Sequence, residues 1–367
     1  PSLSAVFVAC FLGSHSLHIW ADAVFYTPIT KQDDMFPLSY PTTAKTLMSK
    51  HGLLEEQRQE ATENLIRHGT DIHLTYPARE FQFARLPHAP NTLIVGLAQF
   101  DDQTARAVQQ EFAALTAYQQ PILGHRNLES ALFELLYALP DLYLPAIANA
   151  QLPPVYIEAL RDYQIDVILT QQLPTERLPA ALTDFDTQQR PNPSATIEII
   201  TTGQWSPELQ QLIQQQLERG NQIFVVGLTP HQAKGEQGYA QQAMQVNLLY
   251  SEYIPLQAHP LALLTDIMPT VLASYLNCVD DAKAYSIGVD LTSKPRRLPV
   301  MTSYGDDLVV YDQQITSVIH ADAVIHSFDT TSLTPLPGVT PATPVLVDGI
   351  RKLKRFSQER EINPVDE

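Results

Sequence analysis

The chain has 367 residues, of which 44% are hydrophobic and 17% charged, a composition typical of a folded protein with a sizeable core and not of a disordered chain. Lys and Arg number 23 against 40 Asp and Glu, and the formal net charge of −17 argues against a nucleic-acid partner. With only Cys10 and Cys278, a disulfide framework is excluded, and the cysteine content is compatible with either the cytosol or the periplasm.

The first segment, PSLSAVFVACFLGSHSLHIWADAVFY, begins with an apolar run. This run is shorter than the roughly 20 residues that a membrane-spanning helix needs, and it lacks the basic region of a signal peptide. One interpretation is the end of a transmembrane helix, with His15, His18, Trp20 and Tyr26 at the membrane interface, where amphipathic aromatic residues collect. The other is an ordinary buried N-terminal helix, and the sequence leaves both open.

Residues 22–40 are proline-containing and of mixed polarity, which predicts an extended linker. A short helix is predicted to open at Thr42-Thr43 and to stop at Gly52. A second predicted helix, LLEEQRQEATENLIRH, ends at Gly69 and is followed by the irregular, proline-punctuated segment AREFQFARLPHAPN.

From Thr92 onward, short apolar runs alternate with amphipathic segments. The predicted strands are TLIVGLAQF, IDVILT, ATIEIITT and QIFVVGL, and the predicted helices are DQTARAVQQEFAALTAY, ESALFELLYAL, SPELQQLIQQQLERG and HPLALLTDIMPTVLASYLN. This alternation predicts an α/β fold with a mostly parallel sheet covered on both faces. Beyond Arg297, DDLVVYDQQITSVIHADAVIHSFD predicts antiparallel hairpins, and the last segment, KLKRFSQEREINPVDE, is polar.

Several stretches carry a specific resemblance. IWADAVFYTPIT followed by PLSYPTTAKTLMSKHGLL, then NLESALFELLYAL, QQAMQVNLLYSEYIP, LLTDIMPTVLASYL with YSIGVDL, and PRRLPVMTSYGDDLVVYDQQITSVI closely resemble the PbgA/YejM family. Its members are inner-membrane proteins of Gram-negative bacteria with a transmembrane N-terminal part and a sulfatase-like, alkaline-phosphatase-fold periplasmic domain. The resemblance covers most of residues 15–330 and is strongest in the linker.

The resemblance implies a mixed, mostly parallel sheet flanked by helices, with a helical linker and the end of a transmembrane helix before it. We expect residues 1–19 to end the last transmembrane helix and residues 20–88 to form an interfacial linker. Residues 89–335 would form the periplasmic sulfatase-like domain, and residues 336–367 a C-terminal tail. We expect the chain to be a divergent member that lacks the upstream transmembrane helices.

In the family, the linker resembles a sensor that holds a phosphate of lipid A. The residues of this chain agree, because the first N–H groups of a helix are unpaired and, with the positive end of its dipole, form an anion site. The expected lipid or phosphate contacts are Tyr40, Thr42, Thr43, Ala44, Lys45 and Thr46. Family members carry two adjacent arginines at the Lys45-Thr46 position. An arginine can bind a phosphate through two parallel hydrogen bonds, whereas the Lys45 ammonium group is a compact single charge, so this chain should bind the phosphate more weakly. The alternative is an ordinary capped surface helix.

Hydrolases of this superfamily hold a divalent cation with carboxylate and imidazole ligands beside a nucleophile. The resemblance locates the first metal ligand within TLIVGLAQF, where this chain has Leu97, and the nucleophile at Asn127 or Leu128, neither of which can attack. After QIFVVGL the expected Asp-His pair reads Pro230-His231, so only the histidine remains. The sequence therefore predicts a degenerate site with no metal, no cofactor and no catalytic residue.

A rearranged site is the alternative. Its candidate residues are Asp101, Asp102, His125, Glu129, Ser130 and His231. Asp101, Asp102 and Glu129 stand at predicted helix starts, where capping and the helix dipole explain an acidic side chain. The isolated His259, His320 and His326 are interpreted as surface or core residues, and Arg296-Arg297 as a solvated turn.

The function predicted from these observations is non-catalytic. We expect a periplasmic domain of an inner-membrane protein that binds lipid A, lipopolysaccharide or another anionic lipid through its linker and regulates lipopolysaccharide synthesis and outer-membrane homeostasis. By resemblance, the protein would signal the lipopolysaccharide level to the partner LapB through its transmembrane part. The alternatives are a metal-dependent phospho- or sulfo-ester hydrolase with a rearranged site, and an envelope scaffold without lipid specificity.

Overall fold

The computed structural model describes residues 73–77, 83–86, 90–173, 193–230, 236–278, 282–321 and 324–358. The chain divides into two compact units, Pro1–Arg67 and His68–Glu367, and every described residue belongs to the second. The predicted transmembrane end, the linker contacts from Tyr40 to Thr46 and His231 lie outside the described residues, so these stay predictions.

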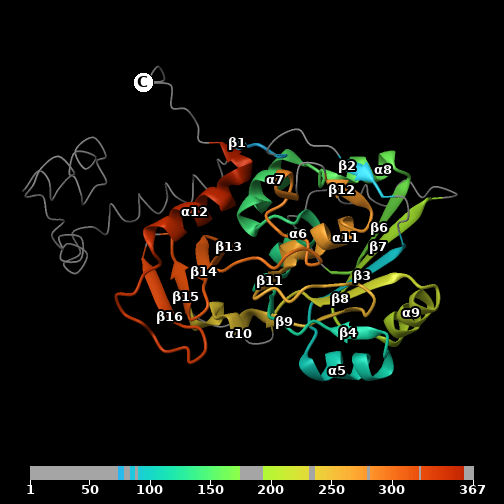
Figure 1. The fold of residues 1–367 in the computed structure, drawn as a ribbon, viewed down its shortest axis with the longest axis horizontal. Coiled ribbons are helices and arrows are strands. Elements are labelled where there is room, and N and C mark those ends of the chain that lie inside the picture. Colours follow the sequence, from blue (N-terminus) through green and yellow to red (C-terminus); the bar gives the residue numbers. More distant parts are fainter. Residues whose placement is uncertain are drawn as a thin grey trace, which may run out of the picture. The chain divides into compact units, whose positions relative to one another are not determined.

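A six-stranded sheet forms the centre of the second unit, in the order β4-β10-β8-β3-β7-β6 (Figure 1). The neighbours β8, β3, β7 and β6 are parallel, whereas β10 is antiparallel to both β8 and β4. All residues of β3 are buried, as expected for a strand covered on both faces. The predicted mostly parallel sheet is therefore confirmed. The bounds are β3 (Thr92–Leu97), β4 (Leu115–Ala117), β6 (Ile165–Gln171), β7 (Ala195–Thr202), β8 (Gln222–Gly227) and β10 (Leu248–Ser251).

Helices cover both faces of this sheet (Figure 1). Ile94 of β3 packs into a cluster with helices on one face, while its neighbours Leu93 and Val95 pack into the cluster on the opposite face, as the two-residue period of a strand requires. The first face carries α6 (Leu128–Tyr137), α7 (Leu144–Ala150), α8 (Tyr156–Asp162) and α11 (Ile267–Leu272), and the second carries α5 (Asp102–Glu111) and α9 (Pro207–Glu218).

A second sheet is an antiparallel meander of four consecutive strands. Its strands are β13 (Val300–Tyr304), β14 (Asp307–Tyr311), β15 (Ile315–Ile319) and β16 (Ile325–Asp329), which confirms the predicted hairpins and adds β13. Helix α12 (Thr343–Leu353) packs on β13. A Cβ atom at Gly349 would lie 2.6 Å from Met301 Cε, so a larger residue there would force the flexible Met301 side chain to shift. Residues 336–367, predicted as a tail, therefore include a helix that packs on the domain.

Short elements complete the described chain. β1 (His73–Leu74) pairs with β17 (Ser357–Gln358), β2 (Phe83–Arg85) pairs with β12 (Leu276–Cys278), and β5 (Ile122–Leu123) lies between β11 (Ala262–Leu263) and β9 (Gln245–Val246). Helix α10 (Gln241–Met244) and the 3-10 turns η2 (Asp141–Tyr143), η4 (Glu236–Tyr239), η5 (Leu264–Asp266), η6 (Ala282–Ala284) and η7 (Lys354–Phe356) join them.

In the part of the chain that the structure describes, no single helix has both the length and the apolar character to cross a membrane. One bent pair, Leu128–Tyr137 with Asp141–Ala150, meets those limits together across a 93° break.

Two predicted helices are wrong in extent. The segment DQTARAVQQEFAALTAY is helical only to Glu111, because Leu115–Ala117 leaves the helix to pair with β10. The segment HPLALLTDIMPTVLASYLN divides into β11, η5 and α11, because the Asp266 carboxylate accepts a hydrogen bond from Leu263 N–H at 2.8 Å and turns the chain there. By contrast, α9 begins and ends as predicted, with Ser206 as its N-cap, Pro207 first, and Gly220 at φ +72° after its end.

The loop before β13 contains a buried ion pair. Asp266 is fully buried and pairs with Arg296, whose side chain is 10% exposed. The carboxylate also accepts hydrogen bonds from the N–H groups of Leu263 and Val289. The prediction that Arg296 lies in a solvated turn is therefore wrong, because a buried carboxylate needs a paired charge that only the folded chain supplies.

Gly288 lets the loop next to this ion pair approach η5. A Cβ atom there would lie 1.9 Å from the backbone oxygen of Thr265, which cannot move aside as a side chain would. We expect Gly288→Ala to lower the free energy of unfolding by about 2 kcal/mol or more. Gly203→Ala is the control, since a Cβ atom at Gly203 would meet no other atom within 4 Å. Urea unfolding of both variants checks this, and equal stabilities would contradict the close approach of the loop to η5.

Candidate functional site

The positions expected to carry hydrolase chemistry meet at the carboxyl edge of the six-stranded sheet. Leu228 N–H donates to Leu97 O at 2.8 Å, and His125 N–H donates to Leu228 O at 2.9 Å. These bonds join the end of β3, the residue after β8 and the segment after β5. In open α/β sheets this edge is where ligands and catalytic groups collect.

None of the predicted degenerate positions described in the structure carries a catalytic group. Leu97 is fully buried. Asn127 is the N-cap of α6, its side-chain oxygen accepting from Ser130 N–H at 3.1 Å, and Leu128 is the first residue of that helix. Pro230 follows β8 in the loop that leads to His231. Helix capping thus explains Asn127 at the nucleophile position.

The other candidates for a rearranged site have helix-terminal roles. Asp101 caps α5 by accepting from Thr104 N–H at 2.7 Å. Asp102 lies in the first turn of α5 and accepts from Asn247 at 3.0 Å, and Glu129 lies in the first turn of α6. The interpretation of these three carboxylates as capping and dipole groups is confirmed.

His125 is the exception, because it is buried within a polar cluster. Its Nε2 lies 3.0 Å from Asp141 Oδ2, and both side chains are at most 4% exposed. Asp141 also accepts from Ser303 Oγ at 2.5 Å and from Gly305 N–H at 2.7 Å. The Tyr304 ring lies 5.0 Å from the His125 ring, centroid to centroid. One carboxylate therefore joins η2, the segment after β5 and the meander.

Hydrogen bonding identifies the neutral tautomer of His125. Its Nδ1 accepts from the backbone N–H of Asn127 at 2.9 Å, so Nδ1 carries no proton. The proton is then on Nε2, which donates to Asp141. Burial alone would raise the pKa of Asp141, but the hydrogen bonds from His125, Ser303 and Gly305 outweigh it and lower the pKa below its ordinary value.

Glu134 lies on α6 beside this pair. It is buried, and its pKa is raised well above the ordinary value by desolvation and then by the nearby Asp141 carboxylate, which favours the protonated form. A backbone hydrogen bond from Asp141 opposes the shift. Among the described residues, the Glu134 Oε1 atom has no hydrogen-bond partner.

His125, Glu134 and Asp141 are the one group among the described residues whose ligand atoms lie close enough for a metal ion, within 4.8 Å of one another. These side chains are bonded to one another and to the backbone. Nε2 of His125 donates to Asp141, Asp141 also accepts from Ser303 and Gly305, and the pKa of Glu134 is raised. Because metal ligands are deprotonated, a metal ion would have to displace the protons of His125 and Glu134 and compete with these hydrogen bonds.

Sequence reasoning missed Glu134, Asp141 and Ser303. Ser303 is 162 residues from Asp141 along the chain, a pairing that no local pattern reveals. One signal was available, because Glu134 is an acidic residue within the otherwise apolar LFELLY of α6. Such a side chain is buried only where the fold provides polar neighbours or neutralises it.

Comparison with known proteins adds independent evidence. Residues 2–83 match the family model described as Domain of unknown function (DUF3413). A protein of Haemophilus influenzae is 32% identical over 42% of this chain and 28% of its own length. The inner membrane protein YejM of Salmonella typhimurium is 24% identical over 89% of this chain and 66% of its own length. The chain thus spans less than two thirds of either relative.

Among solved structures, the chain is similar to a protein in the alkaline phosphatase superfamily from Vibrio parahaemolyticus. The TM-score is 0.52 at 11% identity, with 82% of this chain and 98% of that chain covered. At this identity the likeness concerns the fold alone. Together with the YejM match and the mixed sheet flanked by helices, it confirms both the predicted fold class and the predicted resemblance. The chain is thus similar to the inner membrane protein YejM, and its fold is similar to that of a protein in the alkaline phosphatase superfamily.

Proposed function

We propose that this chain is a catalytically silent, periplasmic part of an inner-membrane protein, whose linker binds a phosphate of lipid A or lipopolysaccharide. In this proposal, lipid binding regulates lipopolysaccharide synthesis and outer-membrane homeostasis, with LapB as the partner reached through a transmembrane part. The membrane location is supported by the Salmonella relative, which is named as an inner membrane protein.

The proposal that the chain is not catalytic rests mainly on the hydrogen-bond network around His125. A superfamily hydrolase needs metal ligands and a nucleophile at the carboxyl edge of the sheet. At that edge this chain has the buried side chain of Leu97, the capping amide of Asn127 and a histidine that donates to Asp141. Each of these groups has a structural role, which leaves the described part of the edge without a metal ligand or an activated nucleophile.

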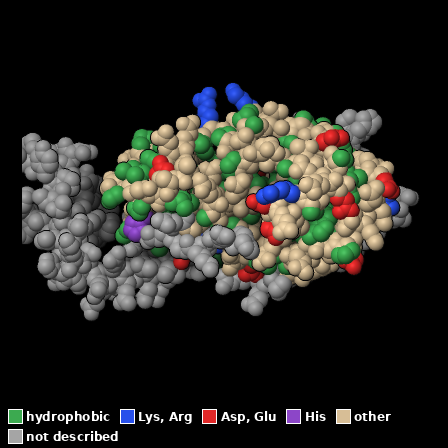
Figure 2. Space-filling view, turned by 90° about the horizontal axis from the view of Figure 1, so that it is seen from below, with side chains coloured by type: hydrophobic (Ala, Val, Ile, Leu, Met, Phe, Trp, Pro, Cys, Tyr) green, Lys and Arg blue, Asp and Glu red, His purple; other side chains and the backbone are tan. Residues whose placement is uncertain are grey.

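The family match covers the linker, and the charge of the chain limits where a lipid phosphate can bind. A body with a net charge of −17 is repelled by an anionic membrane surface, so contact with a lipid phosphate needs a local basic group. On the face of the domain in Figure 2, basic side chains are few and do not gather into a patch. Lys45, beside the predicted helix start at Thr42-Thr43, is the group we assign to this role.

The linker assignment is tested by lipopolysaccharide pull-down. Lys45→Glu reverses the charge at the predicted anion site and should reduce retained protein at least about fivefold. Lys50→Glu is the matched control, because it makes the same charge change in the same segment but farther from the helix start. Equal loss in both variants, or no loss in either, would remove the site at residues 42–46 from this proposal.

The proposed lack of catalysis is tested by measuring metal binding and turnover. After dialysis against zinc, magnesium or manganese, we expect less than about one tenth of a metal equivalent per chain and no hydrolysis of aryl phosphate or aryl sulfate above buffer. His125→Ala should lower stability by about 2 to 4 kcal/mol, since it leaves Asp141 buried with one donor fewer. A stoichiometric metal that His125→Ala releases, or turnover that the substitution abolishes, would favour the rearranged hydrolase instead.

The raised pKa of Glu134 predicts how stability depends on pH. Because its pKa is raised in the folded state, the unfolded chain loses this proton first as the pH rises above about 4.5. Stability should therefore fall toward the folded-state pKa, by up to about 1.4 kcal/mol per pH unit from this group. Glu134→Gln should remove that slope in urea unfolding between about pH 5 and pH 8.

Glu218→Gln is the control for this experiment, because Glu218 is exposed on α9 and its replacement should leave the slope of the wild type. The lowered pKa of Asp141 acts in the opposite direction and only in acid, where its stabilising contribution is lost as the pH falls through the folded-state value. Parallel curves for the wild type and Glu134→Gln would show that Glu134 is ionised in the fold.

A further inference from the structure

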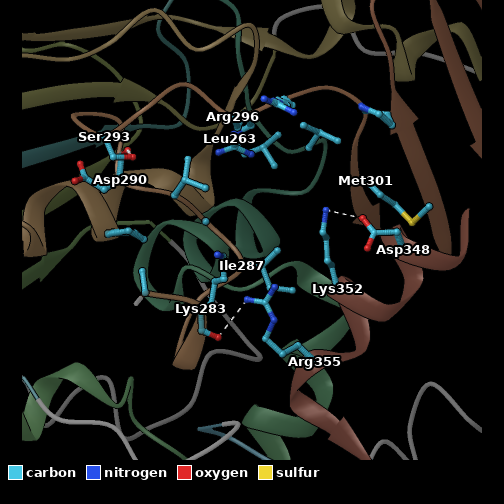
Figure 3. A pocket seen from close by; sticks show the side chains of 18 of the residues that line it. Leu263, Lys283, Ile287, Asp290, Ser293, Arg296, Met301, Asp348, Lys352 and Arg355 are labelled. Atoms are coloured by element: carbon cyan, nitrogen blue, oxygen red, sulfur yellow. Dashed lines mark hydrogen bonds and ion pairs between the residues drawn. The ribbon is translucent and has the colours of Figure 1, made fainter. Parts of the chain in front are cut away.

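A cavity of about 910 Å³ lies between helix α12 and the loop that leads into β13 (Figure 3). Volumes of about 300 to 1,000 Å³ are usual for small-molecule sites. Lys352 of α12 and Arg355 of η7 reach the cavity from one side, Lys283 of η6 lies below, and Arg296 lies on the opposite side. His125, Glu134 and Asp141 are not among the residues that line the cavity.

The charge of the lining is opposite to that of the chain. Five of the lining residues are Lys or Arg and two are Asp, although acidic residues outnumber basic residues in the whole sequence by 40 to 23. Lys352 forms an ion pair with Asp348 at 2.7 Å, and Arg355 donates to the backbone oxygens of Lys283 and Ser286 at 3.2 Å. Basic side chains gathered in a concave site attract anions and exclude cations.

Arg296 supplies an unsatisfied donor at this site. Its side chain is nine-tenths buried and pairs with Asp266, a carboxylate that the N–H groups of Leu263 and Val289 already bond. Within the described chain, Arg296 Nε has no hydrogen-bond acceptor. A buried N–H without an acceptor is costly, and an anion in the cavity would supply one. The adjacent Arg297 is exposed and forms no ion pair with any described residue.

The remaining wall is apolar. Leu263, Met301 and Val310 are buried and line the cavity together with the partly buried Ile287 and Val345. A small inorganic anion would leave this surface wet, whereas an apolar chain would cover it at a gain of about 0.8 kcal/mol per buried methylene. The lining thus combines a cationic end with an apolar wall.

We propose that this cavity binds a molecule with an anionic head, a phosphate or a carboxylate, attached to an apolar chain. The anionic head lies at Arg296, whose Nε lacks an acceptor, and at Arg297, whose charge is not paired with a described residue. The apolar chain of the ligand lies along Ile287, Met301 and Val345. The site is distinct from the lipid contact proposed for the linker and does not depend on it.

Calorimetric titration of the full chain tests the two halves of the ligand separately. Dodecyl phosphate should bind, octyl phosphate should bind at least about tenfold more weakly because fewer methylenes are buried, and inorganic phosphate should bind weakest. Dodecyl maltoside, which has the chain without the charge, should not compete. Equal affinity for dodecyl phosphate and inorganic phosphate would overturn the apolar part of the proposal, and competition by the maltoside would overturn the ionic part.

Arg297→Glu tests the location, since this exposed side chain can be replaced without breaking a described ion pair. It should weaken dodecyl phosphate binding about tenfold or more, whereas Arg106→Glu, the same change on α5, should leave the affinity unchanged. Val345→Trp should fill the part of the cavity that holds the end of the alkyl chain. It should therefore abolish the preference for dodecyl over octyl phosphate.

Two results would overturn the proposal. One is equal binding by Arg297→Glu and Arg106→Glu. The other is loss of dodecyl phosphate binding in Lys45→Glu but not in Arg297→Glu, which would assign the ligand to the linker and support the function proposed above instead. If Arg297→Glu loses binding and Arg106→Glu does not, the cavity site stands whether or not Lys45→Glu also loses binding.

Discussion

The carboxylate of Asp141 joins parts of the domain that are distant in the sequence. It accepts hydrogen bonds from His125, Ser303 and Gly305, which belong to the carboxyl edge of the central sheet and to the meander. A buried carboxylate is tolerated because these donors compensate for its lost hydration. Together with the hydrogen bond from Leu142 N–H to Ser303 Oγ and the apolar contacts of the meander, this group holds the meander against the helical layer.

This constraint bears on the question of catalysis. In a superfamily hydrolase, the edge of the sheet holds charged ligands that remain available to a metal and a substrate. Here the histidine at that edge is hydrogen-bonded through both nitrogens, and the pKa of the acid next to it is raised. The groups that could hold a cation form internal bonds of the fold instead, which accounts for a hydrolase-like architecture in a chain that we propose to be silent.

In both of our proposals, an anion is bound by a small group of neighbouring basic side chains. The acidic chain repels anions as a whole, so a lipid phosphate or a similar group can be held only where basic side chains gather. Two such places are proposed, the helix start beside Lys45 and the cavity lined by Arg296 and Arg297. In the cavity, the Asp266 carboxylate holds Arg296 in place while an N–H of its guanidinium lacks an acceptor.

Local sequence was enough to predict the parallel strands, the limits of α9, the capping role of Asp101 and the buried apolar strand that ends at Leu97, because each depends on residues close together in the chain. The roles of His125, Glu134 and Arg296, and the early end of the helix at Glu111, emerged only from the folded arrangement. The physical reason is that hydrophobic period and capping act over a few residues. The partner of a buried polar group is chosen by which distant segments the closed core brings into contact.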